Sequence, residues 1–330
     1  MIQARLFIKA VVVTACLLIP TVSISVYAGT QKTILMVRGA NAAFQGMHDD
    51  ITKDLKKYLI KDWVIEEKTP YETFFSKVKS ENPDFLILMD NKSIDFGKRW
   101  NLESPKKIPG LGLMALNLIA GLKGDKNIAG ITFESPAYTL ITQFRYFVDF
   151  PIKTVLVFYR KSIFSESIET ARQQLKQEKI TLEAVDVEQN GKSKEDIEKF
   201  ITTKVDSYIS QPEKYSVLWL MLDSKLLSKE LFSNYWLPAA RKTRIPFLTG
   251  LEPLVSSKMN LAVFAVIPSM PDLAGQAVQI VQRILEENES VSSIGVEQLI
   301  SVNKILNKKR SKELGLKLHE DRILDLKLEE

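Results

Sequence analysis

Side chains that could hold a small polar molecule follow six of the strands predicted in this 330-residue chain. Carboxylates can pair with an ammonium group, Arg or hydroxyls with a carboxylate, and Phe or Tyr can cover an apolar body. Because the carboxyl ends of parallel strands meet at one crevice, we expect these groups to lie together. The candidates are Arg38, Asn41, Phe44, Asp90, Asn91, Glu134, Ser135, Tyr159, Ser162, Asp223, Ser224, Thr249 and Glu252.

Each candidate also has a plainer interpretation as a helix cap or a turn residue. This interpretation is the stronger one for Ser135, Ser162 and Ser224 taken singly. The prediction of a ligand site therefore depends on the group of residues and not on any one of them.

Groups suited to catalysis or metal binding are sparse. The two histidines, His48 and His319, lie in charged segments without a second His or Cys nearby. No serine lies in a G-x-S-x-G turn, so a hydrolase triad has no nucleophile. We therefore expect neither an enzyme nor a cofactor.

One glycine pattern matches a dinucleotide-binding fingerprint. The segment 110–115 (GLGLMA) fits G-x-G-x-x-A, and Glu134 follows about 20 residues later, at the spacing of an acidic ribose ligand. The preceding segment, 104–109, contains two prolines and two lysines and does not predict a buried strand. We favour a closely packed strand at this position over a nucleotide site.

The elements that must position these residues alternate between strand and helix. The first half has apolar strands at 32–37, 63–65, 84–89 and 108–114, separated by amphipathic helices. The second half repeats the rhythm, with strands at 154–159, 180–185, 216–222 and 245–248. Alternating strands and helices favour parallel sheets covered on both faces. The sequence therefore predicts an α/β protein with two Rossmann-like lobes.

The last 70 or so residues fit neither series. They contain a strand at 261–267, a helix with Leu273, Ala277 and Ile280 on one face, and a short strand at 300–303. Such a tail is expected to cross back to the first lobe and return, because lobes joined by several connections close about hinges. The acidic turn at 134–136 is the expected first crossing.

The first 28 residues have the layout of an export signal. Arg5 and Lys9 precede an uncharged run, 10–26, and small residues predict cleavage after Ala28. An uncleaved membrane anchor is the alternative. The run is shorter than the ~20 apolar residues of a spanning helix and contains Pro20. We predict export to the periplasm.

Cys16 is the only cysteine, and a lipid anchor at this position is a further alternative. Lys9 lies too close before it, and apolar residues follow where a polar tether is expected. After cleavage at Ala28 the chain would contain no disulfide and no thiolate.

The net charge gives little support for nucleic-acid binding. It is +5 for the whole chain and +3 without the first 28 residues. The basic group at 304–312 alternates with apolar residues and is followed by acids, which favours a solvated helix face. We expect no nucleic-acid partner.

Four segments, taken in order, resemble a known family. The segment 127–132 (NIAGIT) resembles the N-(V/I)-x-G-(V/I)-(T/S) motif of ABC-transporter substrate-binding proteins that include the tryptophan- and tyrosine-type uptake proteins. The segment 155–167 resembles the family's strand, turn and helix V-x-V-x-Y-N-x-x-(E/D)-x-x-S. The segments 244–247 (RIPF) and 303–316 resemble its K-x-I-P strand and its closing N-x-K-x-A-x-x-L-G helix.

Several positions depart from the family pattern. Arg160 stands where Asn is usual, and Asn41 begins a turn in which the family has His-Pro. Ala274 and Asn260 replace glycines. The departures leave the fold unchanged and bear on the ligand, because the turn at Asn41 would be a wall of the pocket.

The resemblance implies a type I periplasmic-binding-protein fold with two lobes and three hinge crossovers, near 133–136, 260 and 296–300. It also implies a monomeric solute-binding protein that closes on an amino acid or related metabolite and delivers it to a membrane permease. A module of the same fold that signals to a membrane sensor kinase is the alternative. The implied domains are 1–28 signal peptide, 29–133 with 261–296 as lobe 1, and 134–260 with 297–330 as lobe 2.

Overall fold

The computed structural model describes residues 31–324 and 326–329. The predicted export signal, its cleavage after Ala28 and the alternative lipid site at Cys16 lie outside these residues. In the described part of the chain, no helix is long and apolar enough to cross a membrane.

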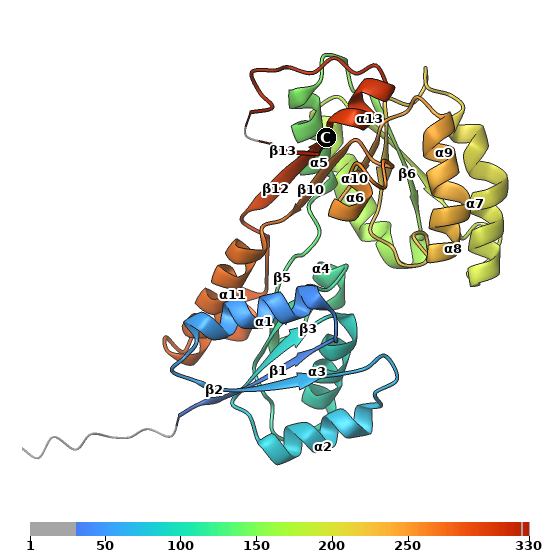
Figure 1. Ribbon diagram of the computed structural model, residues 1–330. Coiled ribbons are helices and arrows are strands. Elements are labelled where there is room, and N and C mark those ends of the chain that lie inside the picture. The colour runs from blue at the N-terminus through green and yellow to red at the C-terminus, as the bar shows by residue number, and fades with distance from the viewer. Residues whose placement is uncertain (1–30, 325, 330) are drawn as a thin grey trace, which may run out of the picture. The chain divides into compact units, whose positions relative to one another are not determined.

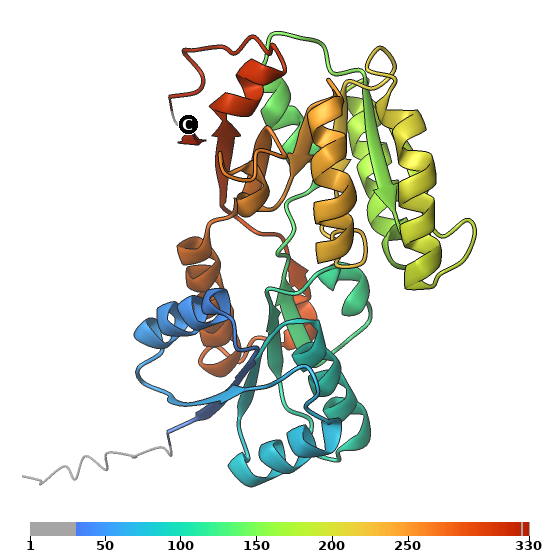
Figure 2. The same ribbon diagram turned by 45° about the vertical axis from the view of Figure 1, so that its right-hand side comes forward.

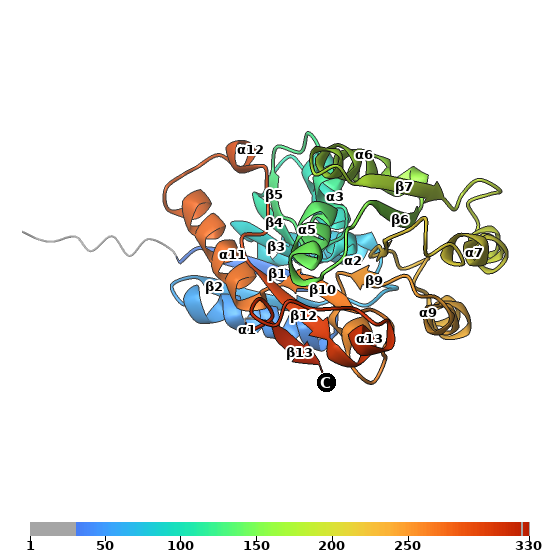
Figure 3. The same ribbon diagram turned by 90° about the horizontal axis from the view of Figure 1, so that it is seen from above.

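The first lobe is built on a six-stranded parallel sheet, and Figure 3 shows most of its strands in sheet order. The strands in sheet order are β11 (Val296–Glu297), β5 (Ile128–Ile131), β4 (Gly110–Leu113), β3 (Phe85–Met89), β1 (Thr33–Arg38) and β2 (Leu59–Val64). The helices are α1 (Ala42–Asp54), α2 (Tyr71–Glu81), α3 (Asn91–Glu103), α4 (Leu118–Gly121), α11 (Met270–Leu285) and α12 (Val291–Ile294).

Both faces of this sheet are buried. Ile34 and Met36 of β1 belong to a core cluster with α1 and α11, whereas Leu35 and Val37 belong to a second cluster with α2 and α3. Successive side chains of a strand point to opposite faces, so the unbroken apolar run at 34–37 supplies both cores.

The second lobe is built on a seven-stranded sheet. Its strands in sheet order are β13 (Lys327–Glu329), β12 (Val302–Asn307), β10 (Phe264–Pro268), β9 (Phe247–Thr249), β8 (Val217–Leu220), β6 (Thr154–Tyr159) and β7 (Thr181–Asp186). Its helices are α5 (Ala137–Phe147), α6 (Lys161–Gln177), α7 (Lys194–Ile209), α8 (Lys229–Leu231), the π-helical turn η1 (Phe232–Trp236), α9 (Leu237–Lys242), α10 (Glu252–Val255) and α13 (Lys308–Glu313).

The strand β6, second from one edge of this sheet, supplies two cores in the same way as β1. Leu156 and Phe158 face one core cluster, and Val155 and Val157 face the other. The pairings are parallel except for that between β10 and β12, which is antiparallel. The helix α6 packs in the cluster with Val155 and Val157, and α7 in the cluster with Leu156 and Phe158, so the two helices cover opposite faces of the sheet. They are the yellow-green and yellow helices in Figure 2.

Local sequence signals account for where several helices begin. The Asn41 side chain accepts a hydrogen bond from the N–H of Phe44 at the start of α1. Ser193 and Asp196 form a reciprocal capping box at the start of α7. These contacts satisfy backbone donors that a helix start leaves open.

The helix α11 returns from the end of the chain to cover the first lobe. Leu273, Ala277 and Ile280 pack in the same core cluster as Met47 and Ile51 of α1. Figure 1 shows the two helices side by side. The first lobe is therefore completed by residues more than 200 positions after its first helix.

The chain crosses between the two sheets three times, as predicted, but one crossing is displaced. The expected lobe boundaries placed 261–296 in the first lobe, with a crossing near Asn260. Instead, β10 pairs with β9 and β12 in the second sheet, so this crossing follows Pro268. An apolar strand fits either sheet, and the packing of Phe264 against Phe144 of α5, with ring centroids 5.5 Å apart, holds it in the second.

A smaller difference concerns the third crossing. Glu297, which the sequence assigned to the second lobe, pairs with Ile131 in the first sheet. The first crossing lies between Ile131 and α5, close to the expected segment 133–136.

Candidate functional site

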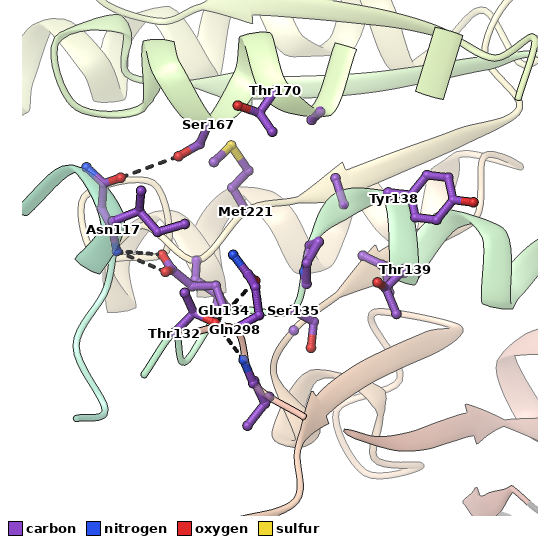
Figure 4. A pocket seen from close by; sticks show the side chains of 18 of the residues that line it. Asn117, Thr132, Glu134, Ser135, Tyr138, Thr139, Ser167, Thr170, Met221 and Gln298 are labelled. Carbon is purple, nitrogen blue, oxygen red and sulfur yellow. Dashed lines mark hydrogen bonds between the residues drawn. The ribbon is translucent and has the colours of Figure 1, made fainter. Parts of the chain in front are cut away.

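A cavity of about 600 Å³ lies at the carboxyl ends of β4, β5, β8 and β9 (Figure 4). Residues from both lobes and from two of the crossovers line it. They come from the segments 117–120, 132–140, 164–174, 219–222 and 298–302, together with Gly250. None of the lining residues is Lys, Arg or His.

Glu134 is a partly buried acid of this cavity. Both of its carboxylate oxygens accept a hydrogen bond from the backbone N–H of Asn117, at 2.9 Å each. Burial disfavours the charged form and raises the pKa of Glu134 to about 7, although backbone N–H groups act in the opposite direction. No basic side chain of the described chain contributes to this balance. A cation entering the cavity would find an uncompensated acid.

Asn117 connects the two lobes beside this acid. Its backbone is left-handed, with φ 56° and ψ 37°, and it precedes α4. Its side-chain Nδ2 donates to the carbonyl oxygen of Ile163 at 2.9 Å, and its Oδ1 accepts from Ser167 Oγ at 3.4 Å. One residue therefore holds Glu134 through its backbone and α6 through its side chain.

The amino-terminal end of α5 forms another part of the wall. Pro136 precedes the helix without a side-chain cap, and residues 137–139 line the cavity. The Ser135 hydroxyl beside them is buried and has no hydrogen-bond partner among the described residues. A helix start favours an anion by roughly 0.3–1 kcal/mol, less than the several kcal/mol that burial of a carboxylate costs. This end of the wall thus favours a neutral hydrogen-bond acceptor of a ligand over a carboxylate.

The remaining wall is largely apolar. Phe164, Trp219 and Met221 contribute to it from the second lobe, with the hydroxyls of Ser167 and Thr170 between them on α6. A few polar groups in an apolar enclosure are typical of a small-molecule site.

Hydrogen bonds join the crossovers that border the cavity. Thr132 donates its N–H to the carbonyl of Glu297 at 2.9 Å, and its hydroxyl accepts from the N–H of Leu299 at 3.0 Å. Ser269 donates to the carbonyl of Ser301 at 3.1 Å. The three crossings are therefore tied to one another as well as to both lobes.

Of the predicted site residues, Glu134 and Ser135 line this cavity. Most of the others lie at strand ends or at the helix starts that follow, and have structural partners of their own. Arg38 forms a two-point ion pair with Asp62, at 3.0 and 2.8 Å, and Asn41 caps α1. Phe44 is half-buried against the core cluster under α1.

Asp90 and Asn91 stabilise loops of the first lobe. Asp90 accepts from the N–H of Ser93 at 2.7 Å at the start of α3, and burial raises the pKa of its carboxyl. The Asn91 side chain exchanges hydrogen bonds with the backbone of Leu116, at 2.8 and 3.0 Å.

The second-lobe candidates have similar engagements. Asp223 has a fully buried side chain and holds Arg160 at 2.7 and 3.0 Å. The Ser162 hydroxyl donates to Glu188 at 2.7 Å. Tyr159 is partly buried against the core, and Ser224 is exposed in a turn. Thr249 is buried, and its hydroxyl accepts a hydrogen bond from the N–H of Leu251. Glu252 forms an ion pair with Lys327.

Sequence reasoning did not identify several cavity residues. Asn117 follows the glycine-diluted strand β4, whose end carried no obvious polar group. Ser167 and Thr170 lie three positions apart on α6, and this spacing was a detectable sign of a shared helix face. Gln298 had no signal in the sequence alone, because the fold brings it to Thr132.

In the described part of the chain, no group of three or more His, Cys, Asp or Glu side chains could hold a metal ion.

No protein-family model and no curated protein matches this sequence. Solved structures do match. A conserved domain protein from Vibrio cholerae aligns with TM-score 0.63 and 15% identity, over 91% of this chain and 100% of its own. The ligand-free, open structure of a substrate binding protein with adhesive properties from Clostridium difficile aligns with TM-score 0.65 and 17% identity, over 90% and 98%.

A third structure is the ABC domain in complex with L-Trp from Streptococcus pneumonia. It aligns with TM-score 0.60 and 15% identity, over 91% of this chain and 100% of its own. At these identities the similarity concerns the fold. The chain has the two-lobed α/β fold of type I periplasmic binding proteins.

Proposed function

We propose that this chain is the exported solute-binding component of an ABC importer, which takes an amino acid or related metabolite into the cavity at Glu134. The observation that carries the proposal is a cavity of about 600 Å³ whose walls come from both lobes and from the crossovers between them. A ligand in such a position contacts both lobes at once and so favours the closed arrangement over the open one.

The types of lining residue support binding over catalysis. Among the described residues they offer the partly buried carboxylate of Glu134, several hydroxyls and amides, and aromatic surface, without an activated nucleophile. The fold is shared with a chain described as a substrate binding protein and with one solved with L-Trp, which agrees with this class of function.

The proposal includes a monomer that begins after Ala28, works in the periplasm and presents its closed form to a membrane permease. Closure changes which surfaces of the two lobes face a partner, so a permease could distinguish loaded from empty protein. Retention of purified permease by the loaded chain and not by the empty chain is the expected result.

The test of solute binding is a thermal-shift screen of amino acids, amines and related metabolites on the mature chain. A ligand present at 100 times its Kd adds about 2.7 kcal/mol of stability, which corresponds to a rise in Tm of several degrees. Isothermal titration calorimetry would then measure the affinity and stoichiometry of each compound that shifts the Tm.

The matched control is Thr170→Trp, which places a large side chain in the cavity from the partly exposed face of α6. This variant should keep its own Tm and lose the shift. The proposal fails if no compound raises the Tm of the native chain. It also fails if the Tm shift is undiminished in Thr170→Trp, because binding would then lie elsewhere.

A further inference from the structure

The charged groups in the cavity wall are all of one sign. Its lining includes Glu134 and Glu166 and no basic side chain. Glu166 is neutralised on the rim by Lys123, at 3.0 Å. Glu134 has only backbone N–H partners among the described residues. The one uncompensated charge of the cavity is therefore negative.

The arginines at the ends of β1 and β6 are not available to a ligand carboxylate. Arg38 is the last residue of β1 and is held by both oxygens of Asp62. Arg160 follows β6 and is held by both oxygens of Asp223, at 2.7 and 3.0 Å. A guanidinium in a two-point pair has its carboxylate-binding edge occupied. Neither arginine can serve as a counter-ion without first losing its partner.

The Glu134 carboxylate retains capacity for a donor. The N–H of Asn117 uses one acceptor site on each oxygen, and a carboxylate has about four such sites. An ammonium group has the positive charge that pairs with this carboxylate and the N–H groups that donate hydrogen bonds to it. Phe164, Trp219 and Met221 provide apolar surface in the same cavity.

The geometry points to an amine that carries no carboxylate as the ligand, with its ammonium group on Glu134 and its apolar body against Phe164, Trp219 and Met221. This inference rests on the proposed solute-binding function and narrows the ligand to one charge class. The Ser135 hydroxyl and the start of α5 then accommodate a neutral hydroxyl or carbonyl of the ligand, or water.

The competing ligand is an amino acid whose carboxylate lies at the start of α5. It would use the same acid for its ammonium group, so loss of Glu134 alone does not separate the two classes. Probes that share one body and differ only in the carboxylate do separate them.

The experiment compares tryptamine, L-tryptophan and indole-3-propionate by isothermal titration calorimetry at pH 8 on the mature chain. Tyramine with L-tyrosine and isoamylamine with L-leucine provide bodies of other sizes. For whichever body binds, the amine should bind at least tenfold more tightly than its amino acid. The acid without an amine should not bind.

Glu134→Gln removes the charge and keeps the shape, and should weaken amine binding by a hundredfold or more. Glu169→Gln is the control, because Glu169 lies on α6, is exposed and pairs with Arg172 outside the cavity. This control removes one negative charge from α6, a helix that also lines the cavity, and should change the affinity less than threefold. Circular dichroism of both variants checks that the fold is kept.

An amino acid that binds more tightly than its amine overturns the inference and leaves the solute-binding function standing. Unchanged amine affinity in Glu134→Gln also overturns it. If none of these probes binds, the charge class of any ligand found by the wider screen decides the inference. A screen without any ligand would overturn the proposed function itself.

Discussion

The carboxylate of Glu134 and the backbone N–H of Asn117 meet at 2.9 Å on both oxygens, at the point where the chain leaves the first sheet. The same Asn117 reaches α6 of the second lobe through its side chain. The acid of the cavity and the contact between the lobes are therefore parts of one arrangement. A change in the charge of Glu134 is expected to affect both.

The first prediction concerns stability and pH. Because the pKa of Glu134 is raised to about 7 in the folded protein, ionisation of this group destabilises the empty protein increasingly between about pH 4.5 and 7. Glu134→Gln removes that cost and should stabilise the empty protein at pH 8 by up to ~3 kcal/mol. Urea unfolding at pH 8 and pH 4 measures the difference, which should vanish at pH 4. Equal effects at both pH values would contradict the burial of this acid.

The second prediction concerns ligand affinity and pH. An ammonium group requires the ionised form of Glu134, so tryptamine affinity should rise about tenfold between pH 6 and 8 and then level off. Glu166, the other acid that lines the cavity, pairs with Lys123 at 3.0 Å. Calorimetry on Glu134→Gln should give a flat profile. A flat profile for the native chain would exclude Glu134 as the counter-ion.

The third prediction concerns the backbone at Asn117. Its left-handed conformation is tolerated by Asn and Gly and costs Ala about 1–2 kcal/mol. Asn117→Ala should therefore lower the free energy of unfolding more than Asn117→Gly, although both lose the hydrogen bond to Ile163. Urea unfolding of the two variants tests this order. The reverse order would contradict a left-handed backbone at this position.

The fourth prediction concerns the buried ion pair of the second lobe. The Asp223 side chain is fully buried on Arg160, so Asp223→Ala should destabilise the protein by about 3–5 kcal/mol. The control Ser224→Ala alters an exposed neighbour and should change stability by less than ~0.5 kcal/mol. Replacing both partners, as Arg160→Met with Asp223→Leu, should restore most of the loss. A small effect of Asp223→Ala would indicate that Arg160 reaches solvent readily.

The fold could be predicted from the sequence because its strands carry unbroken apolar runs. The run at Leu35–Val37 feeds two core clusters, and the run at Val155–Phe158 does the same in the second lobe. The sheet that β10 joins could not be predicted. Its apolar residues fit either sheet, and contacts with α5 decide between them.

The location of the candidate site could be predicted from the sequence, but only some of its residues could. The cavity lies at strand carboxyl ends, as expected, and includes Glu134 and Ser135. At the ends of β1 and β6, Arg38 is paired with Asp62 of β2 and Arg160 with Asp223 in the loop after β8. Such pairing depends on register and side-chain reach, which spacing along a single chain does not reveal.

The late return of α11 has a consequence for how the protein must fold. Until residues 270–285 are available, the apolar face of α1 around Met47 and Ile51 has no cover. The second sheet is similarly incomplete until β12, which pairs with β10, has been synthesised. Long-range contacts of this kind slow folding and leave apolar surface open to aggregation. A chain shortened before residue 270 should therefore be recovered as aggregate, and neither lobe should be obtainable alone from one continuous segment.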